Sequence, residues 1–132
     1  MTADRDPDIQ RVLDRAAIEE CLLRYTRGID RHDVELVMSA FHPDALDTHG
    51  TFEGGPRDVA EWANEQHGLR WDRHMHYVTN TTVDIDGDVA HTDTTTSSCC
   101  AGRTARGRSS WAAGTSIASS GAQATGASPG AW

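Results

Sequence analysis

Asp30, His74 and His76 are of residue types that can transfer a proton. Asp30 follows the apolar Ile29 between two predicted helices. His74 and His76 share one face of a predicted strand, because strand side chains alternate between faces. A histidine can act as a general base near neutral pH, and a buried aspartate can orient its ring and stabilise the imidazolium. These side chains are therefore candidates for acid–base chemistry.

Other interpretations of these residues stay open. Asp30 could be a helix cap or loop carboxylate, and His76 an ordinary strand histidine. His74 and His76 could also bind a metal ion, with His42, His49, His67 and Asp47 as further ligands. No third or fourth ligand is evident from spacing, so we predict no metal and no other cofactor. We expect His32, His42 and His67 to lie on the surface.

Three helical segments precede the strand that carries the histidines. Apolar residues recur at helical spacing from Pro7 to about Arg27, from about Asp33 to Phe41 and from about Pro56 to Gln66. Gly28 should weaken or end the first helix, since glycine loses the most backbone freedom on folding. Asp33 can cap the second helix with its side-chain oxygen. Asp30 is thus expected at a helix end.

Strands are predicted after the second and third helices. A short strand from Ala45 to Thr48 and a returning strand from Thr51 to Glu53 flank a turn. A longer strand spans 73–85, and Asp86-Gly87 after it is a strong hairpin signal. The return strand starts at Val89, and its pattern stops at Asp93. The sequence predicts an α+β fold with a sheet that is incomplete after residue 93.

Composition and charge limit the class of protein. The chain has 132 residues, enough for one domain, and a net charge of −8, which argues against a nucleic-acid partner. It has no run of 18 apolar residues, so we expect no membrane span. The acidic N-terminus lacks an apolar signal core, which favours a cytoplasmic location. Three cysteines without a Cys-x-x-Cys pair make a disulfide framework or zinc site improbable.

The last 39 residues differ from the rest of the chain. They carry a charge of +3, and 29 of them are Ala, Ser, Gly or Thr. Such a segment has little apolar surface to offset the entropy lost on ordering. We therefore divide the chain into a domain at 1–93 and a low-complexity, irregular tail at 94–132.

Several motifs in the first 93 residues resemble those of SnoaL-like proteins of the nuclear transport factor 2-like superfamily. The resemblance covers about residues 9–93, and its motifs are Arg15-Ala-Ala-Ile-Glu-Glu, Gly28-Ile-Asp-Arg-His-Asp, Phe41-His-Pro-Asp-Ala45, Phe52-Glu-Gly and His74-Met-His-Tyr-Val-Thr-Asn80. The resemblance implies a cone of three helices on a strongly curved antiparallel sheet, with a pocket inside.

The resemblance also implies a function. Scytalone dehydratase and hexachlorocyclohexane dehydrochlorinase of this superfamily use an Asp–His pair, which Asp30 and His76 match by motif. This implies a lyase or isomerase of the dehydratase or polyketide cyclase type, acting without a cofactor on a small hydrophobic or cyclic molecule. A homo-oligomer such as a dimer is also expected. The predicted substrate-binding residues are Tyr25, Met38, Phe41, Trp62, Trp71 and His74.

Two other functions compete with this one. The chain could be a ligand-binding or structural subunit, like the small subunit of aromatic-ring dioxygenases. It could also be an inactive, frame-shifted product, because the family closes its sheet with long apolar strands that this tail lacks. Moved by one base, the codons for Ser97-Ser98-Cys99-Cys100 and Ser109-Ser110-Trp111 encode apolar runs. We interpret the tail as the result of a reading-frame slip near Thr94.

Overall fold

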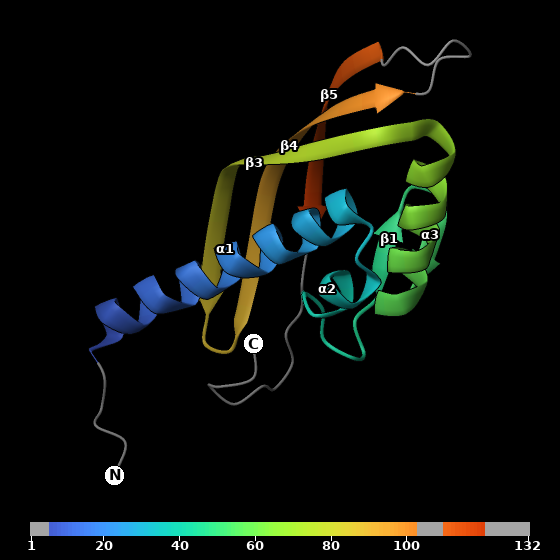
Figure 1. Ribbon diagram of the computed structural model, residues 1–132. Helices are drawn as coiled ribbons and strands as arrows, with labels where there is room; N and C mark the ends of the chain where they lie inside the picture. The colour runs from blue at the N-terminus through green and yellow to red at the C-terminus, as the bar shows by residue number, and fades with distance from the viewer. Residues whose placement is uncertain (1–5, 103–109, 121–132) are drawn as a thin grey trace.

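Helices come first in the chain, and a curved antiparallel sheet follows (Figure 1). The computed structural model describes residues 6–102 and 110–120, the second range as backbone only. The helices are α1 (Pro7–Arg31), α2 (Val34–Met38) and α3 (Pro56–Arg70). One sheet has the order β3-β4-β5, from β3 (Trp71–Asp86), β4 (Val89–Gly102) and β5 (Ser110–Ser120). Strands β1 (Asp47–His49) and β2 (Phe52–Gly54) form a separate pair. The predicted α+β class is confirmed, and the described strands do not close into a barrel.

The turn between α1 and α2 is set by two polar residues. Helix α1 is followed by its C-terminal cap His32, whose φ of 55° lies in the left-handed region. The side chain of Asp33 then accepts from the Leu36 N–H at 3.0 Å and caps α2, as predicted. These two residues reverse the chain within a single turn.

Gly28 does not end the first helix, contrary to our expectation. A Cβ at Gly28 would lie 2.6 Å from Cγ2 of Val37, so glycine allows α1 and α2 to approach closely. Helix α1 continues to Arg31, and Asp30 lies in its last turn rather than between helices. The need for a glycine at position 28 is explained by the close packing of the two helices and not by backbone freedom.

A β-bulge changes which face of β3 meets the helices. The register between β3 and β4 shifts between Thr79 and Thr82, and Asn80 has a φ of 51°. His74, which precedes the bulge, is buried, and Val83, which follows the bulge, is also buried. These two positions would lie on opposite faces of a regular strand. The bulge accompanies the sharp bend that β3 and β4 make together (Figure 1).

Two strands extend into the segment for which we predicted an irregular tail. Strand β4 continues past Asp93 to Gly102, and β5 pairs with it along its whole length. Backbone pairing with β3 and the β-propensity of threonine suffice to extend a strand. Within 94–102, however, the buried hydrophobic core gains only Ala101. Residues 103–109 and 121–132 lie outside the described part, and a domain boundary at residue 93 stays a prediction.

The core lies between the ends of the helices. Its buried residues Ile29, Val37, Ala60 and Ala63 pack with the partly buried Tyr25, Val34, Phe41 and Trp62. The other end of α1 is open, because Val12 is 66% and Leu13 44% exposed, as expected for an incomplete sheet. Val37, by contrast, is fully buried against Gly28 although we expected an incomplete sheet to leave it exposed as well. None of the helices in the described residues is both long and apolar enough to cross a membrane.

Candidate active site

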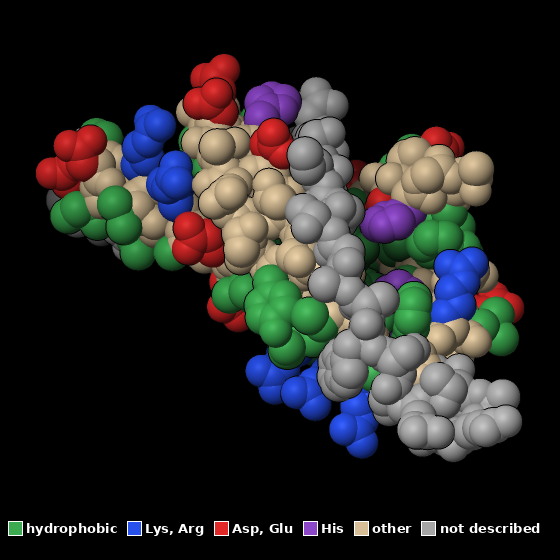
Figure 2. All heavy atoms as spheres, turned by 90° about the horizontal axis from the view of Figure 1, so that it is seen from above, with side chains coloured by type: hydrophobic (Ala, Val, Ile, Leu, Met, Phe, Trp, Pro, Cys, Tyr) green, Lys and Arg blue, Asp and Glu red, His purple; other side chains and the backbone are tan. Residues whose placement is uncertain are grey.

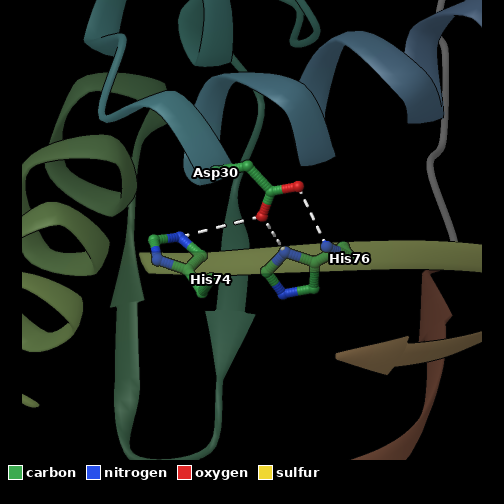
Figure 3. A group of neighbouring side chains, drawn as sticks. All are labelled: Asp30, His74 and His76. Atoms are coloured by element: carbon green, nitrogen blue, oxygen red, sulfur yellow. Dashed lines mark hydrogen bonds and ion pairs between the residues drawn. The ribbon is translucent and has the colours of Figure 1, made fainter. Parts of the chain in front are cut away.

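Asp30 and His76 form the closest polar contact between helix α1 and the sheet (Figure 3). The His76 ring contacts Oδ1 of Asp30 through Nδ1 at 2.6 Å, and the His76 backbone N–H donates to Oδ2 at 2.9 Å. An ionised carboxylate can only accept, so Nδ1 carries a proton, and in the neutral ring Nε2 then carries the lone pair. Figure 3 shows the Nε2 edge pointing away from Asp30. The predicted contact is present, and its catalytic role stays a prediction.

His74 lies on the other side of the same carboxylate. Its side chain is 1% exposed, and Nε2 lies 2.8 Å from the carbonyl oxygen of Ile29 and 3.8 Å from Oδ1 of Asp30. The alternation of β3 brings both histidines under the last turn of α1. Burial lowers the pKa of His74, although the Ile29 carbonyl and the Asp30 carboxylate act in the opposite direction. This histidine is therefore neutral near pH 7.

His67 belongs to the cluster, contrary to the prediction that it lies on the surface. It is half-buried in the last turn of α3, and its Nδ1 lies 3.1 Å from Nε2 of His74. The sequence contained a signal for this position. Ala60 and Ala63 are buried, and His67 continues their helical spacing. We missed it because we ended the third helix at Gln66.

Asp30, His74 and His76 could together hold a metal ion, since one donor atom from each lies within 4.8 Å of the others. The geometry of His74 argues against a three-ligand site. Its Nε2 faces a carbonyl oxygen at 2.8 Å, so that nitrogen carries a proton and has no lone pair for a cation. In this tautomer the cluster is better suited to proton transfer than to metal coordination.

The predicted substrate-binding aromatic residues pack around the core. Tyr25 and Phe41 make an edge-to-face contact at 5.6 Å, and Trp62 stacks on Phe52 at 4.7 Å. Met38 and Trp71 are half-buried elsewhere on α2 and β3. Burial, assisted by the Asp47 carboxylate, strongly raises the pKa of Tyr25, so its phenol stays a neutral donor. Of the predicted set, only His74 contacts Asp30 directly.

Two hollows are found away from the Asp30–His76 pair. One of about 300 Å³ lies at the β3–β4 hairpin, lined by residues that include Val83 and His91. Another of about 170 Å³ lies between α1 and the segment after α2, beside Cys21 and Phe41. On the α3 side of the molecule, histidine and hydrophobic side chains are neighbours at the surface (Figure 2). Neither hollow is lined by the cluster, in which the side chains of Asp30, His74 and His76 are 13%, 1% and 22% exposed.

Helices packed on a bent antiparallel sheet, with a carboxylate and histidines at their junction, give this α+β protein the fold of a solved structure described as nuclear transport factor 2-like. A family model described as a SnoaL-like domain matches residues 10–125. The chain therefore belongs to the SnoaL-like domain family. The matched region extends beyond residue 93, where we expected the resemblance to end.

Solved structures share this fold at low sequence identity. Rv3472 from Mycobacterium tuberculosis, a protein of unknown function solved as a variant, is 22% identical with a TM-score of 0.65, over 87% of this chain and 62% of that one. The chain thus spans less than two thirds of that relative. A candidate scytalone dehydratase from Novosphingobium aromaticivorans DSM 12444 is 17% identical with a TM-score of 0.63, covering 81% and 72%.

A third structure carries the superfamily name. This nuclear transport factor 2-like protein from Salmonella enterica serovar Typhimurium LT2 is 19% identical with a TM-score of 0.62, over 76% of this chain and 73% of that one. None of the curated proteins compared with the chain matches it. The similarity to these three structures establishes the fold, and the family match establishes the family.

Proposed function

We propose that the chain is a small-molecule lyase or isomerase of the dehydratase or cyclase type, in which His76 removes a proton from carbon. The observation that supports this most is the two-point contact of Asp30 with the His76 ring and backbone, at 2.6 and 2.9 Å. It fixes the ring orientation and leaves Nε2 as the base. A dehydratase name on one structural relative agrees with this chemistry at the level of the fold.

The proposed reaction needs no further reactant. Nε2 of His76 takes the proton, and the Asp30 carboxylate stabilises the imidazolium that forms. The electron pair left on carbon either expels a leaving group, which gives a lyase, or moves onto an adjacent carbonyl oxygen, which gives an isomerase. The imidazolium then returns its proton to the leaving group or to another carbon. The residues proposed to bind the substrate are Tyr25, Met38, Phe41, Trp62, Trp71 and His74.

Deuterium exchange tests this proposal without knowledge of the natural substrate. A panel of cyclic ketones and β-hydroxy ketones would be incubated with the protein in deuterated water, and exchange followed by mass spectrometry. For any compound that exchanges, His76→Ala and Asp30→Asn should each slow turnover by about 10²–10⁴-fold. His91→Ala, at an exposed position of β4, is the control and should leave the rate unchanged. Full rates in both variants would contradict the proposal.

A non-catalytic role is the second candidate, favoured by a different observation. Neither of the two hollows lined by described residues contains Asp30 or His76, so neither would place a bound substrate against the proposed base. A ligand-binding or structural subunit, or an inactive frame-shifted product, would have this property. Ligand binding without exchange would favour the subunit, and absence of both would favour the inactive product. A cytoplasmic location and a homodimer stay predictions.

A further inference from the structure

His67 lies alongside the proposed base. The ring centroids of His67 and His76 are 6.3 Å apart with an interplanar angle of 28°, so the two rings are roughly parallel. The ring of His74 lies between α3 and Asp30, with its centroid 4.4 Å from that of His67. A substrate that reaches Nε2 of His76 therefore approaches His67 as well.

The tautomer of His74 follows from its surroundings. A carbonyl oxygen only accepts, so the 2.8 Å contact with Ile29 requires a proton on Nε2 of His74. The other nitrogen, Nδ1, is buried and has no hydrogen-bond partner among the described residues. A second proton there would create a buried, unpaired cation, which is costly. His74 is therefore neutral and protonated on Nε2.

The tautomer of His67 then follows from that of His74. Nδ1 of His67 lies 3.1 Å from the same Nε2 of His74, whose one hydrogen is shared between the Ile29 carbonyl and His67. A proton on Nδ1 of His67 would face that N–H, so we assign Nδ1 of His67 as an acceptor. A neutral imidazole has one N–H, so the proton of His67 is on Nε2. Burial, followed by the neighbouring histidines, lowers the pKa of His67 to about 4, which keeps this ring neutral. His67 thus presents a neutral N–H donor.

Two roughly parallel imidazoles consequently have opposite roles. Nε2 of His76 is an acceptor because Asp30 holds the proton on Nδ1, and Nε2 of His67 is a donor because His74 occupies Nδ1. Resting on the proposed function, we infer that His67 donates a hydrogen bond to a substrate oxygen on the carbon next to the one that His76 deprotonates. The substrate class is then an enolisable carbonyl compound or a β-hydroxy carbonyl compound.

The inferred step balances without another reactant. His76 takes the proton from carbon, and the electron pair of the broken C–H bond forms the C=C bond of an enolate. The negative charge accumulates on the carbonyl oxygen, which accepts from Nε2–H of His67. A donor aimed at a developing oxyanion is worth about 10²–10³-fold in rate. His74 would act as a positioning residue that sets the tautomer of His67.

Nitrogen NMR on protein labelled with ¹⁵N-histidine tests the tautomers directly. We expect His67 and His74 to carry their proton on Nε2, and His76 to carry its proton on Nδ1. In His74→Phe, which removes the donor to Nδ1, His67 should become a mixture of both tautomers. His67 protonated on Nδ1 in the wild-type chain would overturn the inference, whatever the exchange assay shows.

Binding of 4-nitrophenolate, an enolate mimic, tests the donor. His67→Ala should weaken binding by about 10–100-fold, as for loss of a hydrogen bond to a charged group. His67→Gln, which restores an N–H donor, should recover much of it, and His91→Ala should bind as the wild type does. Absence of phenolate binding by the wild type, or equal binding by His67→Ala, would overturn the inference. Phenolate binding through His67 without deuterium exchange would instead contradict only the proposed function.

Discussion

The Asp30 carboxylate contacts His74 and His76, two of a group of four imidazoles. The group also contains His67 and His32, and the ring of His32 lies 5.1 Å from that of His74. One carboxylate cannot balance several positive charges, and burial disfavours the charged forms further. Burial, with the neighbouring histidines, lowers the pKa of His67 and His74, and these two rings are therefore neutral near pH 7. Hydrogen-bond partners, and not residue identity, decide which nitrogen can act as a base.

The low pKa of His67 predicts a pH dependence of stability. Its pKa falls from an ordinary value of 6.5 to about 4 on folding, so between these values the unfolded chain binds a proton that the folded chain does not. This stabilisation is fully present above pH 6.5 and is lost as the pH falls through about 4. The urea midpoint should drop less between about pH 7 and pH 4.5 in His67→Gln than in the wild type. His91→Gln is the control. An equal decrease of the urea midpoint in all three proteins would contradict the assignment of this pH dependence to His67.

Helix α1 positions Asp30 through its close contact with α2. Val37 lies against Gly28, two residues before the carboxylate, so any separation of the helices would displace Asp30. The start of α2 is in turn fixed by the side chain of Asp33, which caps this helix. The geometry of the candidate site thus depends on a glycine that makes no polar contact with it.

Substitution of two helical glycines tests this dependence. Gly28→Ala places a Cβ 2.6 Å from Cγ2 and 2.7 Å from the backbone nitrogen of Val37, so α2 must shift. We expect a loss of about 1–3 kcal/mol in the free energy of unfolding. Gly68→Ala in α3 meets nothing within 4 Å and should be neutral or stabilising by about 0.5–1 kcal/mol. Similar urea midpoints for the two variants would contradict the packing account.

Local signals predicted the elements better than they predicted the contacts between them. Pro7, Pro56 and the Asp33 cap marked helix starts correctly, and Asp86-Gly87 marked the hairpin. Each of these residues acts on the backbone of its own segment, so its effect can be predicted from the local sequence. The bulge at Asn80 and the packing role of Gly28 depend on partners distant in the chain. For that reason the Asp30–His76 contact could be predicted only through the family resemblance, and the contact of His67 with His74 was not predicted.

At the scale of the whole molecule, the sheet extends past residue 93, but within residues 94–102 it adds only Ala101 to the buried hydrophobic core. Strand β4 reaches Gly102 with half-buried Cys99 and Cys100, and the exposed Val12 shows that α1 is incompletely covered. A closing strand normally contributes about 1.5–3 kcal/mol for each large side chain that it buries. We therefore retain the frame slip near Thr94 as a prediction.

Restoring the proposed reading frame tests this prediction. The corrected chain should unfold at a higher temperature and more cooperatively, because apolar side chains would replace serine, cysteine and threonine in the last strands. Circular-dichroism melts and hydrogen exchange would compare the two versions, and the coding DNA across codons 90–100 would show any slip. A cooperative melt of the present chain, with strong protection in β4 and β5, would contradict the slip.

Chemical rescue tests the central claim, that Nε2 of His76 is the base, most directly. His76→Ala leaves space beside Asp30 that free imidazole can enter. The account predicts that deuterium exchange, lost by about 10²–10⁴-fold in His76→Ala, rises with imidazole concentration. Rescue should fail in the double variant with Asp30→Asn, because nothing then orients the imidazole. Exchange at the wild-type rate in His76→Ala without imidazole would contradict the claim.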